Sequence, residues 1–214
     1  ALDGGDPALE ANYRDEVFEV EAPFSGEGKS LVKTTNRFSG IDWGTENTAI
    51  VYDYWWDTRN RKAYVFNPSN SSSKPKVLYD RNYQDIYSDP GSFLKTRNTF
   101  NKSVLMLYKG NAYLRGAGFS KEGQFPFIDK LNITTLNKSR AYQSKYTDKV
   151  EAIQDYNPST NELIVRIESP TEYPNYYSKK TNGKKLSKIT DFENPFKELQ
   201  NIKKEVIAYK SCLL

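Results

Sequence analysis

Residues 38–67 contain three runs of β-branched and aromatic residues, and turn-forming residues separate these runs. The runs cover residues 41–43, 49–56 and 63–66, so we predict three neighbouring antiparallel strands. A polar tract follows, and residues 74–81 supply a fourth strand. A four-stranded meander with a short first strand, a long apolar second strand and a polar last strand cannot bury both of its faces alone. Other parts of the chain must therefore cover this sheet.

The four-strand plan recurs along the chain. Its final polar strands begin near Lys29, Lys74, Lys138 and Lys184, and their offsets average about 50 residues, which is the length of a large propeller blade. We therefore predict an all-β chain that forms a partial β-propeller of about three and a half four-stranded blades. A plain β-sandwich is the alternative that this pattern leaves open.

The repeat predicts how the chain is divided. The partial propeller covers residues 1–194, with a blade remnant at 1–36 and blades at about 37–85, 86–146 and 147–194. The remnant holds two strands, Glu16–Glu21 and Lys29–Thr35, which are the last two of their blade. Residues 195–214 form an exit segment.

Two finer predictions concern the second blade and the exit segment. The apolar run Val104–Tyr108 is predicted to be a strand buried on both faces, and Gly116–Gly123 is predicted to be an insertion. In the exit segment, Phe196, Leu199 and Ile202 fall at helical spacing, before residues 205–209 become strand-like.

Composition narrows the classes of partner. Aromatic residues make up 14% of the chain, which favours β-structure because these side chains supply large buried areas to sheets. The net charge of +4 is too small and too evenly spread to predict nucleic-acid binding. No run approaches the about 18 apolar residues that cross a bilayer, so we predict a soluble chain with no membrane partner. The single cysteine, Cys212, excludes an intrachain disulfide.

The chain contains no histidine. A Ser-His-Asp or Cys-His triad and a His-containing zinc site are therefore impossible within it, and no G-x-S-x-G sequence is present. We predict that this chain by itself is not an enzyme, with no catalytic residue, no metal and no cofactor. Gly26–Ser30 lacks the first glycine of a phosphate-binding loop and is predicted to be a hairpin turn. Asp3, Asp6 and Asp15 match no calcium-binding spacing.

Candidate binding residues gather after the second strand of the first complete blade. Arg59 and Arg61 follow Trp55 and Trp56 at a strand end, and Arg97 is a further cation in the next blade. Their guanidinium groups could attract carboxylates of a peptide and bind them through bidentate hydrogen bonds. A solvated hairpin tip needs no such function, and that interpretation stays open. Asp53 and Asp57 flank the tryptophan pair in a pattern that would also suit sugar binding by ring stacking.

Several longer strings stand in a fixed order along the chain: LDGGDP (2–7), YRDEVF (13–18), RFSGIDW (37–43), YDYWWDTRNRK (52–62), VLYDRNYQDIYSDPGSF (77–93), PFIDKLNITTLNKSR (126–140), ITDFENPF (189–196) and KKEVIAY (203–209). Together they resemble the β-propeller region of the glutamyl endopeptidase-like branch of the prolyl oligopeptidase family of serine peptidases. The resemblance covers essentially the whole chain. Its most specific piece is LYDRNYQDIYSDPGSF.

The resemblance implies a non-catalytic role. In the complete enzyme this propeller caps the active site of an α/β-hydrolase domain, which we expect to be absent from this chain, and it limits access to peptides. The implied partner is thus a peptide substrate. The resemblance also implies an exported or organellar setting for some members, while the sequence leaves cytoplasmic and exported or periplasmic locations open. The alternative is a free-standing interaction or carbohydrate-binding module that self-associates through exposed blade faces.

Overall fold

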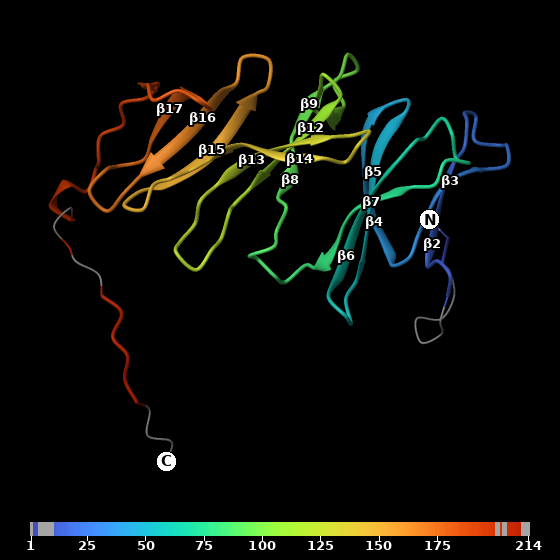
Figure 1. The fold of residues 1–214 in the computed structure, drawn as a ribbon, viewed down its shortest axis with the longest axis horizontal. Helices are drawn as coiled ribbons and strands as arrows, with labels where there is room; N and C mark the ends of the chain where they lie inside the picture. Colours follow the sequence, from blue (N-terminus) through green and yellow to red (C-terminus); the bar gives the residue numbers. More distant parts are fainter. Residues whose placement is uncertain (1, 4–10, 200–201, 203–204, 211–214) are drawn as a thin grey trace. The chain divides into compact units, whose positions relative to one another are not determined.

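Antiparallel β-sheet makes up almost all the regular structure of the computed structural model (Figure 1). The structure describes residues 2–3, 11–199, 202 and 205–210. The chain divides into two compact units, Ala1–Ser144 and Lys145–Leu214, and each is described by itself.

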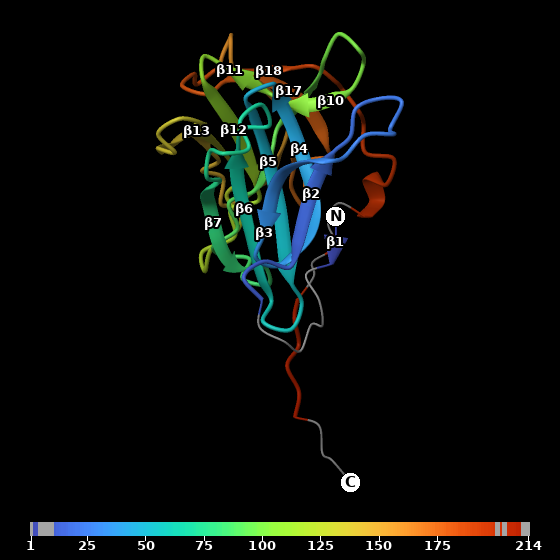
Figure 2. The same cartoon turned by 90° about the vertical axis from the view of Figure 1, so that its right-hand side faces the viewer.

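The first unit contains three stacked sheets and one hairpin. The remnant sheet has the order β1-β2-β3, with bounds Leu2–Asp3, Asp15–Glu19 and Lys29–Thr34. The first blade sheet has the order β4-β5-β6-β7, with bounds Arg37–Thr45, Thr48–Trp55, Asn60–Phe66 and Lys76–Asn82 (Figure 2). The second blade sheet has the order β11-β12-β13-β14, with bounds Leu107–Tyr108, Asn111–Gly116, Phe127–Asn132 and Lys138–Gln143.

Two further elements of the first unit complete the second blade sheet. The short strand β8, Ser92–Phe93, also pairs with β12. The strands β9, Lys95–Arg97, and β10, Ser103–Leu105, form an inserted hairpin between β8 and β11. The edge of this sheet next to β12 is therefore made of two short strands, β8 and β11, and the β9–β10 hairpin lies between them in the chain.

The second unit holds the third blade sheet, with the order β15-β16-β17-β18 and bounds Val150–Asn157, Glu162–Glu168, Asn175–Lys180 and Leu186–Lys188. Leu163, Val165 and Ile167 alternate along β16 and are buried, as the sequence predicts. In all three blade sheets, strands that neighbour each other in the chain also neighbour each other in the sheet. This meander topology is that of a propeller blade.

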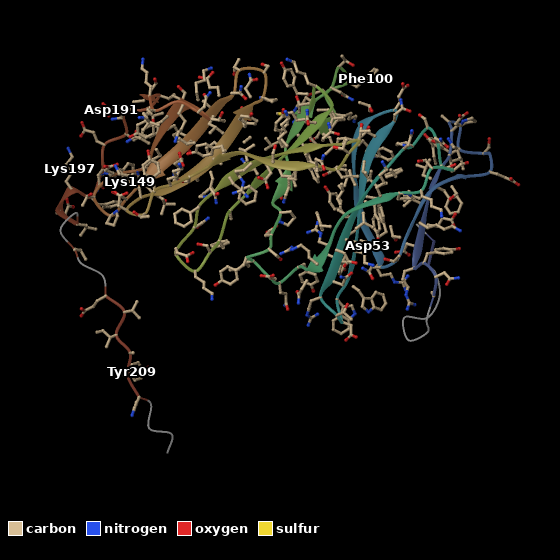
Figure 3. All side chains as sticks on the ribbon, viewed as in Figure 1. Asp53, Phe100, Lys149, Asp191, Lys197 and Tyr209 are labelled. Carbon is tan, nitrogen blue, oxygen red and sulfur yellow. The ribbon has the colours of Figure 1, made fainter. Side chains whose placement is uncertain are left out.

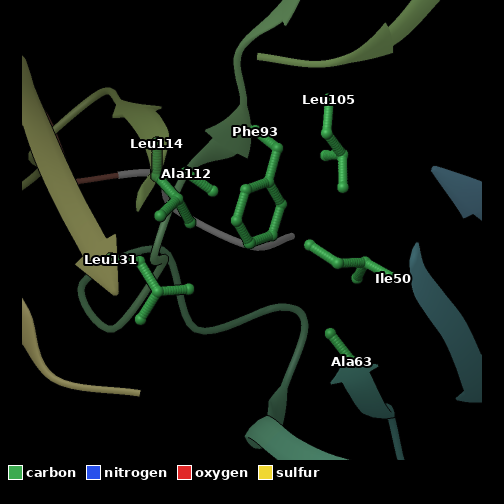
Figure 4. Close-up of a cluster of buried hydrophobic side chains, with 7 residues drawn as sticks. All are labelled: Ile50, Ala63, Phe93, Leu105, Ala112, Leu114 and Leu131. Carbon is green, nitrogen blue, oxygen red and sulfur yellow. The ribbon is translucent and has the colours of Figure 1, made fainter. Parts of the chain in front are cut away.

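The first blade sheet is covered on both faces. Alternate side chains of β5 point to opposite faces, so Ala49 and Val51 pack with Leu31 and Val32 of the remnant sheet. Ile50 points the other way and packs on the second blade sheet. Figure 4 shows the cluster there, which contains Ile50, Ala63, Phe93, Leu105, Ala112, Leu114 and Leu131. Sheets of the first unit thus stack face to face as blades do, and the predicted all-β partial propeller is confirmed.

The prediction that Val104–Tyr108 is a strand buried on both faces is wrong. The run Val104–Tyr108 is divided between β10 and β11, and Leu105 is its only buried residue. The central strand is instead β12, which the sequence analysis missed. Lys109 and Gly110 have φ angles of 49° and 73° and form a two-residue turn that joins Tyr108 to Asn111. The chain reverses there, so the run after the turn takes the central place.

The exit segment also differs from its prediction. Among residues 195–199, 202 and 205–210, which the structure describes in this segment, regular structure is limited to a 3-10 turn at Lys197–Leu199, and residues 205–210 form no strand. Phe196, Leu199 and Ile202 all stay exposed. Since a short helix needs a packed apolar face, the helical spacing of these residues does not suffice to form one.

Candidate functional site

A polar cleft opens at one end of the remnant and first blade sheets. Its volume is about 1050 Å³. Residues that precede β2, the connection between β3 and β4, and the ends of β5, β6 and β7 form its walls. Four asparagine side chains come together there from these separate segments: Asn12, Asn36, Asn60 and Asn82.

The carboxylate of Asp53 holds the wall of this cleft from the inside. Asp53 follows Val51 by two residues on β5, so it points toward the remnant sheet and is 0% exposed. One oxygen, Oδ2, accepts hydrogen bonds from the backbone N of Asn36 at 3.0 Å and from the Tyr64 hydroxyl at 3.0 Å. The other oxygen, Oδ1, accepts one from Asn36 Nδ2 at 3.0 Å. Asp53 therefore has a structural position (Figure 3) and offers no free carboxylate to a sugar.

From Asp53 a chain of hydrogen bonds runs along the wall of the cleft. Asn36 Nδ2 also donates to Asn60 Oδ1 at 2.7 Å, and Asn60 Nδ2 donates to Asp80 Oδ1 at 2.6 Å. Lys62 Nζ lies 3.3 Å from Asp80 Oδ2. Because the side-chain amides of Asn36 and Asn60 are each hydrogen-bonded to the next residue of this series, the polar groups of the wall are fixed in position before any ligand binds.

Two of the predicted residues lie side by side in the sequence but in different surroundings. Trp55 lines the cleft, and the Arg14 guanidinium carbon lies 4.9 Å from its ring centroid. Trp56 is 63% exposed at the tip of the β5–β6 hairpin, where the Arg59 guanidinium carbon lies 5.5 Å from its ring centroid. Arg59 also donates a hydrogen bond to the Trp56 carbonyl. Trp55 therefore belongs to the cleft, and Trp56 with Arg59 forms the adjacent solvated tip.

The structure does not bring the other predicted arginines to this cleft. Arg61 lies on the opposite face of the first blade sheet, with its guanidinium carbon 5.3 Å from the Tyr52 ring centroid. Arg97 lies on the inserted hairpin and donates to the Asn101 carbonyl at 2.9 Å. The predicted residues thus occupy four places: the cleft, the adjacent hairpin tip, the opposite face of the sheet and the inserted hairpin.

The asparagines of the cleft were missed by the sequence analysis. Asn36 and Asn60 stand in TTNR and TRNR, which are ordinary turn sequences, so their local signal is that of a turn former. No local pattern indicates that they converge. Only the stacking of the remnant sheet on the first blade sheet brings them together.

The Tyr64 hydroxyl, which donates to Asp53, has a raised pKa. Burial and the neighbouring Asp53 carboxylate raise the pKa of the Tyr64 hydroxyl to about 12. Thr35 Oγ1 lies 2.9 Å from the same hydroxyl. The folded chain therefore keeps this proton at pH values where an unfolded tyrosine, with a pKa of about 10, has lost it.

We expect the free energy of unfolding to fall more steeply between pH 10 and pH 12 in the wild type than in a Tyr64→Phe variant. Below pH 10 the protonated Tyr64 hydroxyl stabilises the folded wild type, and this stabilisation is lost as the hydroxyl deprotonates. The phenylalanine of the variant has no proton to lose, so the variant lacks this contribution at every pH. Urea unfolding of both proteins at intervals from pH 8 to pH 12 measures this. A stability difference that stays constant across the series contradicts the expectation.

The remaining residues named in the sequence analysis either form hydrogen bonds within the fold or lie outside the described residues. Asp15 accepts a hydrogen bond from the backbone N of Phe38 at 2.7 Å and pairs with Arg37 at 3.3 Å. Asp6 and Cys212 lie outside the described residues, as does the side chain of Asp3. Within the described ranges, no three His, Cys, Asp or Glu side chains are grouped to hold a metal ion. The helices found there are too short or too polar to cross a membrane.

Comparison with known proteins shows which proteins the chain is similar to. No family model matches the chain. The chain is 34% identical over 224 residues to the "Probable glutamyl endopeptidase, chloroplastic" of Oryza sativa subsp. japonica. It is 32% identical over 225 residues to the protein of the same name from Arabidopsis thaliana, and both alignments cover 97% of this chain. Over this segment the chain is a homologue of the glutamyl endopeptidases. The resemblance inferred from the sequence strings is thereby confirmed.

The glutamyl endopeptidase homologue spans about a quarter of the length of these relatives, 24% of the Oryza protein and 23% of the Arabidopsis protein. Among solved structures, it is similar to TolB from Acinetobacter baumannii, with a TM-score of 0.39 and 12% sequence identity. That alignment covers 84% of this chain and 38% of TolB.

Proposed function

We propose that this glutamyl endopeptidase homologue is the non-catalytic propeller part of a serine peptidase, and that it caps the active site and binds or filters peptide substrate. The observation that supports this proposal best is the asparagine-lined cleft. Homology over 97% of the chain connects the cleft to peptidases, and the absence of histidine from the sequence fits a part that holds substrate without cleaving it.

The chemistry of the cleft suits a peptide main chain. A primary amide carries both a donor NH₂ group and an acceptor oxygen, which are the groups that a peptide unit also presents. The hydrogen-bonding groups of the cleft asparagines that are not used within the wall can therefore pair with the main chain of a peptide whatever its side chains are. With a volume of about 1050 Å³, the cleft exceeds the usual pocket for a small ligand and has room for several residues.

The arginines would add a charge preference to this main-chain recognition. Arg59 lies with Trp56 at the hairpin tip beside the cleft, from where its guanidinium group would attract an acidic side chain of a bound peptide. Arg61 and Arg97 lie elsewhere in the unit and would act only through the longer-range field, which salt screens over about 8–10 Å. We therefore assign direct contact to Trp55 and Arg59, and a secondary role to Trp56, Arg61 and Arg97.

A pair of adjacent tryptophans tests the proposal. We expect Trp55→Ala to weaken the binding of a ten-residue Ala/Ser peptide with a central Glu by about 10-fold or more, since buried tryptophans dominate binding surfaces. Trp56→Ala, one residue away but outside the cleft, should change the affinity by less than about 2-fold. Calorimetric titration of the wild type and both variants measures the two affinities.

The controls separate the parts of this proposal. If Arg59 interacts with the Glu carboxylate, the wild type should bind the same peptide with Gln in place of Glu more weakly than the Glu peptide. An Arg59→Gln variant should then bind the two peptides with equal affinity. Equal losses in Trp55→Ala and Trp56→Ala would exclude the cleft as the binding place. Turnover of the peptide by the chain itself would contradict the non-catalytic role.

A carbohydrate-binding module is the second candidate, because Trp55 stands beside asparagines and Asp80, and this combination also suits sugars. One face of the Trp55 ring is already covered by Arg14, which leaves a single face for stacking. Titration with a panel of neutral oligosaccharides decides between the two. Saturable sugar binding that Trp55→Ala abolishes, with no binding of peptide, would favour the module.

A further inference from the structure

A second, smaller cavity lies between the first and second blade sheets. Its volume is about 300 Å³, at the lower end for a ligand pocket. Leu78, Leu114, Leu131 and Phe93 are among its apolar walls, and Arg81 also lines it. It is separate from the asparagine-lined cleft, which lies on the other face of the first blade sheet.

Two arginines stand together on the sheet face that borders this cavity. Arg61 on β6 and Arg81 on β7 are directly opposite each other in the strand register. Side chains opposite each other on one face are close neighbours, and like charges in such a pair repel. In the described part of the chain neither guanidinium group forms an ion pair with a carboxylate. Arg81 donates to neutral acceptors, Ser88 Oγ at 3.3 Å and the Asp85 carbonyl.

Arg61 has an unsatisfied buried donor. Its Nε atom is buried and has no hydrogen-bond partner, and the guanidinium group contacts the Tyr52 ring instead. Leaving such a charged donor without an acceptor is costly, so native proteins seldom do so without a reason. An acceptor that the chain itself does not supply is therefore expected next to Arg61.

Tyr79 lies on the same face of the sheet as the two arginines, opposite Ala63 in the strand register. It lines the cavity, and although burial raises the pKa of its hydroxyl, the Arg61 and Arg81 guanidinium groups oppose that rise. The nearby acids are occupied with other partners. Asp42 accepts from the Tyr52 hydroxyl at 2.9 Å and pairs with Lys95 at 2.6 Å, while Asp89 accepts from the backbone N of Gly91 at 2.9 Å. The carboxylate of Asp85 interacts electrostatically with Arg81 and accepts from the backbone N of Tyr87 at 3.0 Å. None of these three carboxylates forms an ion pair with either arginine in the described part of the chain.

We propose that this cavity binds a carboxylate that carries a small apolar group. The carboxylate would be held by Arg61 and Arg81, and the apolar group would lie among the leucines and Phe93. A free branched-chain acid and the C-terminal residue of a peptide both have this chemistry. The inference does not depend on the function proposed for the cleft, because the residues in direct contact with ligand differ between the two sites and lie on opposite faces of the sheet, and Arg61 acts on the cleft only through its longer-range field.

Four probes test the two halves of the site by calorimetric titration of the whole chain. N-acetyl-leucine mimics a peptide C-terminus, 4-methylpentanoate is a free acid, N-acetyl-leucine amide lacks the charge, and acetate lacks the apolar group. We expect at least one of the first two to bind 10-fold or more tightly than both the amide and acetate. Binding of only one of them identifies the source of the ligand. Equal binding of N-acetyl-leucine and its amide, or no binding of any probe, would overturn the proposal.

Variants identify the residues. Arg61→Gln and Arg81→Gln should each weaken the bound probe by 10-fold or more. Lys102→Gln removes the same charge from the inserted hairpin, away from the cavity lining, and should leave the affinity unchanged. Thermal unfolding without ligand checks that each variant is folded, and the comparison of probes on the wild type stands even if one variant unfolds. Equal loss of binding in Lys102→Gln would show a general effect of net charge and would refute the site.

Discussion

Phe93→Ala should lower the free energy of unfolding by about 3–5 kcal/mol, as large-to-small changes at buried phenylalanines do. Phe93 is 7% exposed and lies on β8, at the centre of the cluster that joins the first and second blade sheets. Its ring packs among Ile50 of one sheet and Leu114 and Leu131 of the other. Removing it leaves a cavity at the surface where two blades meet, and urea unfolding measures the loss.

Phe100→Ala is the matched control for this prediction. Phe100 is 81% exposed at the tip of the inserted hairpin, seven positions along the same segment (Figure 3). The same change in side-chain volume there should alter stability by less than about 0.5 kcal/mol. Similar effects at the two positions would mean that the sheets do not stack through this cluster.

Asp53→Ala is expected to have the second large effect, a loss of about 3 kcal/mol or more from the free energy of unfolding. The substitution removes the acceptor of four hydrogen bonds, from the backbone and side chain of Asn36, from Tyr64 and, at 3.5 Å, from Thr35. Each donor left unsatisfied in a buried place costs about 1–3 kcal/mol, and water that enters from the cleft recovers part of that. Urea unfolding at pH 7 measures the net loss.

Two further substitutions control the Asp53 experiment. Asp57→Ala removes an exposed carboxylate from the adjacent hairpin tip and should change stability by less than about 0.5 kcal/mol. Asp53→Asn keeps the shape and one acceptor oxygen, so its loss should be intermediate. If Asp53→Ala and Asp57→Ala are equally mild, the buried carboxylate does not hold the wall of the cleft.

The strands of the first and third blade sheets could be predicted because their signals are local. The run Ala49–Trp56 is rich in residues that suit strands, and Leu163, Val165 and Ile167 alternate with polar neighbours, so each segment indicates its own conformation. The second blade was harder because two apolar runs, on either side of the Lys109–Gly110 turn, both suit a central strand. Packing against the first blade sheet decides between them in favour of β12.

The candidate sites were only partly predictable for a related reason. Trp55 and Trp56 are neighbours, but Trp55 is the last residue of β5 and Trp56 lies in the turn that follows, so their side chains have different surroundings. Which of them faces a cleft depends on where the remnant sheet lies. In the same way, Arg61 was grouped with Arg59 because two positions separate them, yet the turn and the strand register place Arg61 opposite Arg81 on another face.

The sequence by itself determined that the chain is built of repeated β-meanders, that it contains no histidine, and that it is related to the glutamyl endopeptidases. These properties rest on residue type, short-range periodicity and similarity along the chain. Only the tertiary structure decided which face of each sheet is buried, that four asparagines meet in one cleft, and that Arg61 and Arg81 stand opposite each other on the sheet face that borders the smaller cavity. The physical reason is that a strand has two faces, and the sheets packed on them come from distant parts of the chain.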